Sequence, residues 1–111
     1  MIFNNESDIM ANELLSLREL VLKHKANLAG ASLVGANLAN ADLSGLDLTG
    51  ANLEDVNLCN ANLTGANLTN ANLKNADLTG ANLYDAVFTG ANLDGADFTK
   101  SEHNFFKLLT K

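Results

Sequence analysis

The sequence contains no proline and only one cysteine among its 111 residues. The lone cysteine, Cys59, excludes an internal disulfide framework and is typical of a reducing compartment. Basic residues are scarce, with seven Lys and Arg against thirteen Asp and Glu and a net charge of −6. Direct binding of nucleic-acid phosphates requires clustered Lys and Arg. The composition therefore predicts a protein without a direct nucleic-acid interface.

Long apolar runs and a basic amino-terminal segment are also missing. The first eight residues hold no Lys or Arg, and no apolar stretch approaches the length that spans a bilayer. We therefore expect neither a signal peptide nor a membrane span. A cytoplasmic protein without a membrane partner is the natural interpretation.

One five-residue pattern recurs from Ala26 to Lys100, in fifteen consecutive units. The first residue of a unit is Ala with two exceptions, the second is Asn or Asp with two exceptions, and the third is Leu or Phe. A period of five gives these side chains no common face on an α-helix or on a straight strand. The predicted core consists of the third-position residues Leu28, Leu33, Leu38, Leu43, Leu48, Leu53, Leu58, Leu63, Leu68, Leu73, Leu78, Leu83, Phe88, Leu93 and Phe98.

A corner in every unit resolves the conflict between the period and the regular elements. The fifth position is Gly, Asn or Asp in every unit except the last, which ends in Lys100. These residue types tolerate a positive φ and favour turns. If each unit turns the chain by about a right angle, four units close a square coil around the Leu side chains. The missing proline fits this interpretation, because the backbone N–H groups must then bond to neighbouring coils.

Repeats of the form A-[DN]-L-x-x resemble those of the pentapeptide-repeat family, and the resemblance covers about two thirds of the chain. It implies an all-β solenoid, namely a right-handed quadrilateral β-helix, in which fifteen units make nearly four coils. The family is especially numerous in cyanobacteria, which are the expected source. Most of its members have no assigned activity, so the resemblance indicates architecture more strongly than function.

Three regions are predicted: residues 1–25, a lead-in and an α-helical cap; residues 26–100, the repeat array; and residues 101–111, a C-terminal cap or tail. From Asp8 to His24 the apolar spacing is helical, and such a helix would cover the open end of the solenoid. The apolar residues of the helix form two stripes, Met10, Leu14, Leu17 and Val21 on one side and Ala11, Leu15 and Leu22 on the other. A homodimer would use either the stripe with Leu15 and Leu22 or the tail with Phe105 and Phe106.

No arrangement of residues in the sequence predicts catalysis or a bound cofactor. His24 and His103 lie at opposite ends of the array, so local spacing cannot bring them to one metal ion. Cys59 falls at an outward position without a neighbouring base, as do the Ser and Thr residues. We therefore expect a non-enzymatic protein with no catalytic, metal or cofactor-binding residues.

The predicted function is a rigid module that contacts a protein partner of unknown identity. The predicted contact residues, assigned to two adjacent faces, are Glu54, Asp55, Tyr84, Asp85 and Asp94. Exposed Tyr is enriched at interfaces. The alternative is a DNA mimic that binds DNA gyrase, an activity known in this family. A third interpretation is a purely structural or ice-binding solenoid, suggested by the column Ala29, Thr49, Thr69 and Thr89.

Overall fold

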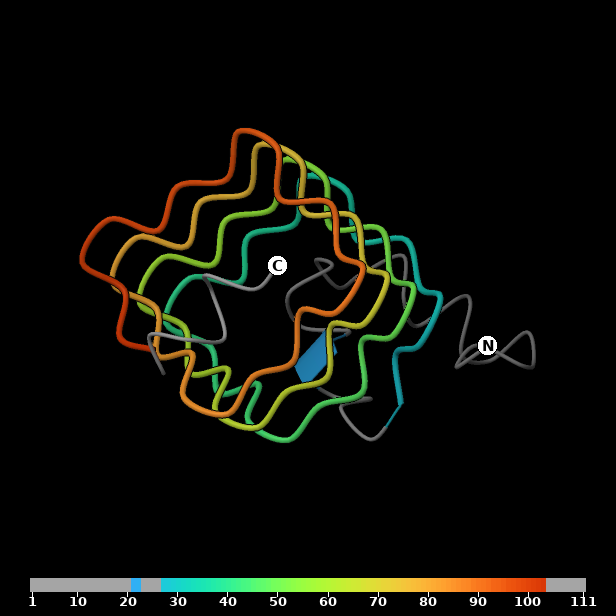
Figure 1. The fold of residues 1–111 in the computed structure, drawn as a ribbon, viewed down its shortest axis with the longest axis horizontal. Coiled ribbons are helices and arrows are strands. Elements are labelled where there is room, and N and C mark those ends of the chain that lie inside the picture. The colour runs from blue at the N-terminus through green and yellow to red at the C-terminus, as the bar shows by residue number, and fades with distance from the viewer. Residues whose placement is uncertain (1–20, 23–26, 104–111) are drawn as a thin grey trace.

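The computed structural model describes residues 21–22 and 27–103. Residues 21 and 22 are helical, and residues 27–103 wind into a stack of coils (Figure 1). The rest of the predicted capping helix, including Leu15, lies outside the described residues, and so does the tail with Phe105 and Phe106. Between 27 and 103 the chain has isolated bridges and turns and no longer strand.

The bridges establish how many units make one coil. Every bridge among the described residues is parallel and joins second-position residues that are twenty positions apart, from Ser32 with Asn52 to Asn82 with Glu102. Twenty residues are four pentapeptide units, so each coil has four sides. The predicted repeat of four units per coil is confirmed.

Each unit turns the chain in the same way. The N–H of Ala31 donates to the carbonyl oxygen of Leu28 at 3.0 Å, and the same bond recurs from unit to unit. The fifth residue of all fifteen units has a positive φ, from 59° at Lys100 to 73° at Gly30. A positive φ at only the third residue of a four-residue turn defines type II, which favours Gly or Asn at that place. Lys100 is the one residue there without this tolerance, at a conformational cost of about 1 kcal/mol.

Neighbouring coils are joined by a fixed set of backbone hydrogen bonds. The third and fifth N–H groups of a unit donate to the next coil, as Leu33 does to Asn52 at 2.8 Å and Gly35 to Glu54 at 2.9 Å. The second N–H of the next coil donates back, as Asn52 does to Ala31 at 2.9 Å. Proline at any of these places would remove a donor, which explains its absence.

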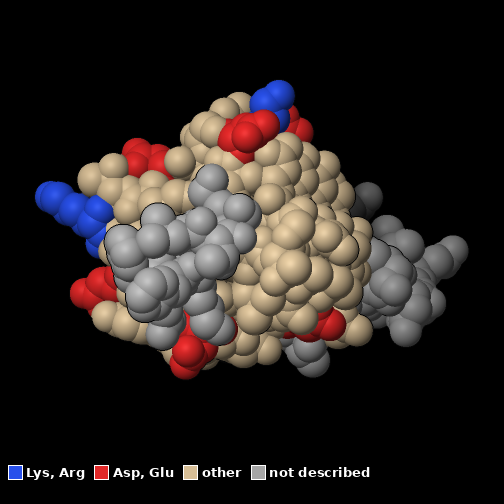
Figure 2. Space-filling model, in the orientation of Figure 1, with Lys and Arg blue, Asp and Glu red and all other residues tan. Residues whose placement is uncertain are grey.

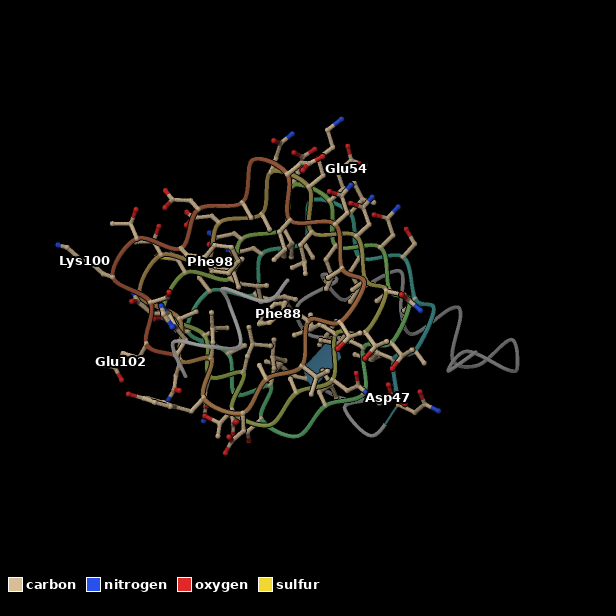
Figure 3. The ribbon with its side chains drawn as sticks, in the orientation of Figure 1. Asp47, Glu54, Phe88, Phe98, Lys100 and Glu102 are labelled. Atoms are coloured by element: carbon tan, nitrogen blue, oxygen red, sulfur yellow. The ribbon has the colours of Figure 1, made fainter. Side chains whose placement is uncertain are left out.

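The core is a column of third-position side chains with small first-position residues beside them. Leu28 to Phe88 are all buried, at 5% exposure or less, whereas Leu93 and Phe98 in the last coil are only partly buried. Phe88 and Phe98 pack edge to face with ring centroids 6.2 Å apart, inside the coils (Figure 3). The core therefore extends through the whole stack and is least covered at its C-terminal end.

Backbone pairing continues past the end of the side-chain pattern at Lys100. Glu102 bridges to Asn82, and its carbonyl oxygen accepts from the N–H of Leu83 at 2.6 Å. Main-chain groups make these bonds, so the coil continues although Ser101 and His103 stand where Ala and Leu stand elsewhere.

Candidate interaction surface

The flat sides of the β-helix carry one outward side chain per unit, that of the second residue, which is Asn or Asp except at Ser32 and Val87. Its oxygen accepts a hydrogen bond from the fourth-position N–H of the same unit, as Asn57 does from Cys59 at 3.0 Å and Asn92 from Asp94 at 3.0 Å. This is a local turn bond that Asn and Asp form readily. The polar second position is therefore explained by structure, and the remaining outward side chains lie at the corners.

The fourth and fifth positions stack every twenty residues into four corner ridges. Two of them are mostly small or hydroxyl-bearing at the fourth position: Ala29, Thr49, Thr69 and Thr89 in the first threonine ridge, and Ala39, Cys59, Thr79 and Thr99 in the second. The charged ridge consists of Val34, Glu54, Asp55, Lys74, Asn75 and Asp94. The tyrosine ridge consists of Ser44, Thr64, Tyr84 and Asp85. The ridges of different character therefore alternate around the coil.

The predicted contact residues do not form one cluster. Glu54, Asp55 and Asp94 lie on the charged ridge, whereas Tyr84 and Asp85 lie on the tyrosine ridge. With four units per coil, ridges two units apart are on opposite sides of the molecule. The prediction that these five residues lie on two adjacent faces is therefore wrong. In Figure 3, Glu54 and Glu102 lie on opposite sides of the coil outline, and Glu102 bridges to Asn82, which belongs to the same unit as Tyr84.

The charged ridge presents charges of alternating sign along the stack. Glu54, Lys74 and Asp94 occupy the fourth position in successive coils, so their backbones are separated by about 4.8 Å per coil. Lys74 and Asp94 are exposed, Glu54 is partly buried, and Val34 extends the ridge with an apolar side chain that is 44% exposed. Figure 2 shows charged groups around the rim of the molecule, with both signs side by side at its upper edge. A partner would meet an ordered pattern of charges here.

The first threonine ridge has hydroxyl groups that serve the coil itself. The hydroxyl of Thr69 donates to Oδ1 of Asn67 at 2.6 Å, and Thr99 on the second threonine ridge does the same to Asp97 at 2.5 Å. These bonds direct the hydroxyl hydrogens along the protein surface. Thr49 and Thr69 on this ridge are therefore explained by turn chemistry.

The hydroxyl bonds also affect two carboxylates. The Thr49 hydroxyl, together with the Thr49 N–H, lowers the pKa of Asp47. The Thr99 hydroxyl and N–H lower the pKa of Asp97, with a smaller contribution from Thr79. In both cases the hydrogen bonds favour the ionised form. Both carboxylates therefore resist protonation while their turns are intact.

The remaining reactive side chains are isolated in the described part of the chain. Cys59 is a partly buried free thiol. Nδ1 of His103 and the hydroxyl of Ser101 are buried and have no hydrogen-bond partner among the described residues. Residues 21–22 and 27–103 contain no group of three or more His, Cys, Asp or Glu residues placed to hold a metal ion. Within the same residues no helix is long and apolar enough to cross a membrane.

The repeat pattern matches a known family. The sequence profile described as Pentapeptide repeats matches residues 24–60 and 66–101, with eight copies. The chain belongs to the pentapeptide-repeat family. Pentapeptide-repeat proteins form right-handed quadrilateral β-helices and act in general as structural or interaction modules. A comparison with curated proteins gave no match.

Several solved structures resemble this pentapeptide-repeat chain. HetL of the cyanobacterium Nostoc sp. strain PCC 7120, involved in heterocyst differentiation regulation, is 38% identical, with a TM-score of 0.56 over 68% of this chain and 38% of HetL. A thylakoid-lumen protein of Arabidopsis thaliana is 29% identical, with a TM-score of 0.63 over 76% of this chain and 64% of that protein. A second Nostoc PCC 7120 protein is 36% identical over 85% of this chain and 88% of its own, with a TM-score of 0.45. The chain thus spans less than two thirds of the first two relatives.

Proposed function

We propose that this pentapeptide-repeat protein is a rigid, non-enzymatic interaction module whose charged ridge contacts a protein partner in the cytoplasm. The proposal rests on the different structural roles of the five positions in each unit. First and third side chains fill the core, and second-position side chains hold the turns. Only the corner ridges are free to differ from coil to coil, so recognition has to be encoded there.

The charged ridge is better suited to recognition than the other three. It combines an exposed apolar side chain, Val34, with Glu54, Lys74 and Asp94, whose charges alternate in sign. Complementary charge patterns give specificity and correct register more than raw affinity. Because the coils are held by backbone bonds, this pattern is pre-organised and loses little conformational entropy on binding.

We infer that the chain shares the right-handed coil of its family and that the predicted helical cap covers its N-terminal end. Two observations support the cap. Residues 21 and 22 are helical, and Val21 is buried in the same core cluster as the coil leucines. A covered end is what a solenoid of few repeats requires for solubility.

Mimicry of a nucleic-acid duplex, with DNA gyrase as the target, is the second candidate. Residues 27–103 carry nine carboxylates and two lysines, a net charge of −7. Over four coils of about 4.8 Å this is roughly one net negative charge per 3 Å of axis, against one per about 1.7 Å in duplex DNA. The density is of the same order, but Lys74 interrupts the charged ridge. We therefore rank this candidate below the interaction module.

Affinity capture with three double variants of the full chain tests the proposal. Glu54→Lys with Asp94→Lys alters the charged ridge, Tyr84→Ala with Asp85→Lys alters the tyrosine ridge, and Thr49→Lys with Thr89→Lys is the control on a threonine ridge. We expect the first variant alone to lose the protein that the wild-type chain captures from its source lysate. Equal capture by the first and control variants would reject the charged ridge as the contact surface.

The two candidate functions are separated by a supercoiling assay with purified gyrase. The interaction-module proposal predicts no inhibition by the wild-type chain at concentrations that saturate its captured partner. Inhibition that is lost in the first double variant would favour duplex mimicry instead.

A further inference from the structure

The charged ridge offers one fourth-position side chain in each coil, namely Val34, Glu54, Lys74 and Asp94 in order. The carbonyl oxygens of the last three accept hydrogen bonds of 2.8–2.9 Å from the fifth-position N–H groups of the coil before. Coils bonded in this way are about 4.8 Å apart, so the four side chains start at about 0, 4.8, 9.6 and 14.4 Å along the stack. The ridge is therefore a rigid row with an apolar, a negative, a positive and a negative member.

The three charges of this row are not paired with one another. Neighbouring coils carry opposite signs, yet no ion pair joins Glu54, Lys74 or Asp94 to any described residue. Lys74 and Asp94 are exposed, and Figure 3 labels Glu54 at the edge of the coil outline. A partner can therefore pair with each charge without first breaking an ion pair within this chain.

The apolar end of the row lies where the repeat departs from its pattern. Ser32 stands in the unit of Val34 at the place where the later coils of this side have Asn52, Asn72 and Asn92. Ser is smaller than Asn, and both Ser32 and Val34 are exposed. An apolar side chain stabilises a complex when a partner removes its surface from water. This end therefore offers contact area, whereas the three charges determine the register.

An α-helix laid along the row matches its spacing. Helix residues at i, i+3, i+7 and i+10 share one face and rise by about 0, 4.5, 10.5 and 15 Å. Each of these values is within about 1 Å of the corresponding place on the ridge. An extended strand in the same direction has same-face residues about 6.7 Å apart, so it is out of step by about 4 Å at the third coil. The spacing therefore favours a helix over an extended peptide.

The order of the charges specifies which side chains the helix must carry. Facing the ridge from Val34 to Asp94, the helix needs an apolar residue, a cation, an anion and a second cation. Asp55, exposed beside Glu54, adds to the negative charge of the second coil. A helix shifted by one coil would place one of its cations against Lys74, and like charges at a contact are unfavourable. The ridge therefore selects one register.

We propose that the charged ridge binds an amphipathic α-helix of the partner protein, lying along the stack with an apolar residue, a cation, an anion and a cation at i, i+3, i+7 and i+10. This inference rests on the proposed function, because it names the kind of partner that the ridge contacts. The spacing is the same when it is read from either end of the helix. The chain direction of the partner helix is therefore left to the contacts beside the row.

Binding of synthetic peptides to the full chain tests this inference directly. The matched probe is an alanine-based helical peptide with Leu, Lys, Glu and Lys at i, i+3, i+7 and i+10, made in both chain directions. One control probe is the same helix with the charges exchanged to Leu, Glu, Lys and Glu. The other has the matched residues at alternate positions of an extended, Thr-rich peptide. In fluorescence anisotropy at low salt, the better matched probe should bind the wild-type chain about tenfold more tightly than either control.

A variant with the ridge charges exchanged turns this preference into a gain of binding. Glu54→Lys with Lys74→Glu and Asp94→Lys should bind the charge-exchanged helix about tenfold more tightly than the matched helix. Thr49→Lys with Thr89→Lys is the matched control, because it raises the net charge by the same amount at outward positions of the same coils as Glu54 and Asp94. This control should keep the preference of the wild type.

Three results with the probes would overturn a helix as the occupant: equal binding of the matched and charge-exchanged helices, tighter binding of the extended probe, or no binding. A wild-type dimer that dissociates when the ridge charges are exchanged would also overturn it, since a second copy would then occupy the ridge. These results are separate from the test of the proposed function. If Glu54→Lys with Asp94→Lys abolishes partner capture while no helical probe binds, the ridge is a contact surface but its partner is not a helix.

Discussion

The first and last coils of this β-helix have the same repeat but different surroundings. In the first coil every third-position leucine is buried, whereas in the last coil Leu93 and Phe98 are partly exposed. Backbone bonding also differs, because a row of N–H groups in the last coil donates to none of the described residues, whereas those of the first coil donate to the coil that follows. The same pentapeptide therefore has buried or partly exposed core residues, depending on its place in the stack.

The comparison extends to the corners of the coils. The glycines at Gly30, Gly35, Gly45 and Gly50 have no atom near the place a Cβ would occupy. In later coils, the Asn at the fifth position twenty residues earlier extends over the glycine: Asn60 over Gly80, Asn70 over Gly90 and Asn75 over Gly95. Replacing glycine at an early corner therefore meets only the strain of the positive φ, whereas at Gly80, Gly90 and Gly95 a Cβ would also displace an Asn side-chain amide.

The difference between the ends predicts unequal costs for one core substitution. Leu33 and Leu93 occupy the same column in the first and last coils. Leu33→Ala should lower the free energy of unfolding by about 3 kcal/mol, because it leaves a cavity in a covered core. Leu93→Ala should cost about 1 kcal/mol, since this side chain is already partly exposed. Urea unfolding followed by circular dichroism measures both.

Equal losses from the two leucine substitutions would contradict the comparison. They would show that the C-terminal end is as well covered in solution as the N-terminal end.

The corners predict a smaller difference between two glycine substitutions. Gly50→Ala should cost about 1 kcal/mol, the penalty of a non-glycine residue at φ 69°. Gly80→Ala should cost about 2–3 kcal/mol, because its Cβ would also overlap Oδ1 of Asn60. Thermal unfolding of the two variants measures the difference.

A double variant checks the cause assigned to Gly80. Adding Asn60→Gly removes the overlapping amide, so the cost of Gly80→Ala should fall to that of Gly50→Ala. If Asn60→Gly leaves the cost of Gly80→Ala unchanged, the overlap is not its cause.

Sequence alone predicted the coil because its causes are local. A positive φ is accessible to Gly, Asn and Asp, so their recurrence at every fifth place specifies a corner before any tertiary contact is known. Lys100 shows the limit of that rule: it adopts the same conformation because the backbone bonds around it impose the turn. For the same reason pairing reached Glu102 although the side-chain pattern had ended.

The arrangement of the candidate surface was harder to predict. The sequence contains the order of the units. Whether Glu54 and Tyr84 lie on the same side of the coil depends on the number of units between them, because every fourth unit returns to the same side. The separation of the charged and tyrosine ridges follows from that number and needs no structure. Exposure of Leu93 and Phe98 could not be read in this way, because it depends on what covers the stack and not on the repeat.

The smallest predicted effect concerns acid, and it compares Asp47 near the N-terminal end with Asp97 near the C-terminal end. Both have a pKa below the ordinary value of about 3.9 because their threonine neighbours hydrogen-bond to the ionised form. A lowered folded-state pKa contributes stability that is present above the unfolded-state value and is lost as the pH falls through the folded one. The melting temperature should therefore decrease below about pH 4 from these groups and not between pH 7 and 5.

Single substitutions assign the acid effect to each end. Asp47→Asn and Asp97→Asn keep the turn acceptor, as Asn57 does, and remove the titrating group. Each should make the decrease in melting temperature below pH 4 shallower. Thr99→Val should act like Asp97→Asn, because the Thr99 hydroxyl is the largest cause of the lowered pKa. If Thr99→Val leaves the acid limb as steep as in the wild type, the C-terminal end does not hold that hydroxyl bond in solution, and the Asp47 turn alone would account for the acid dependence.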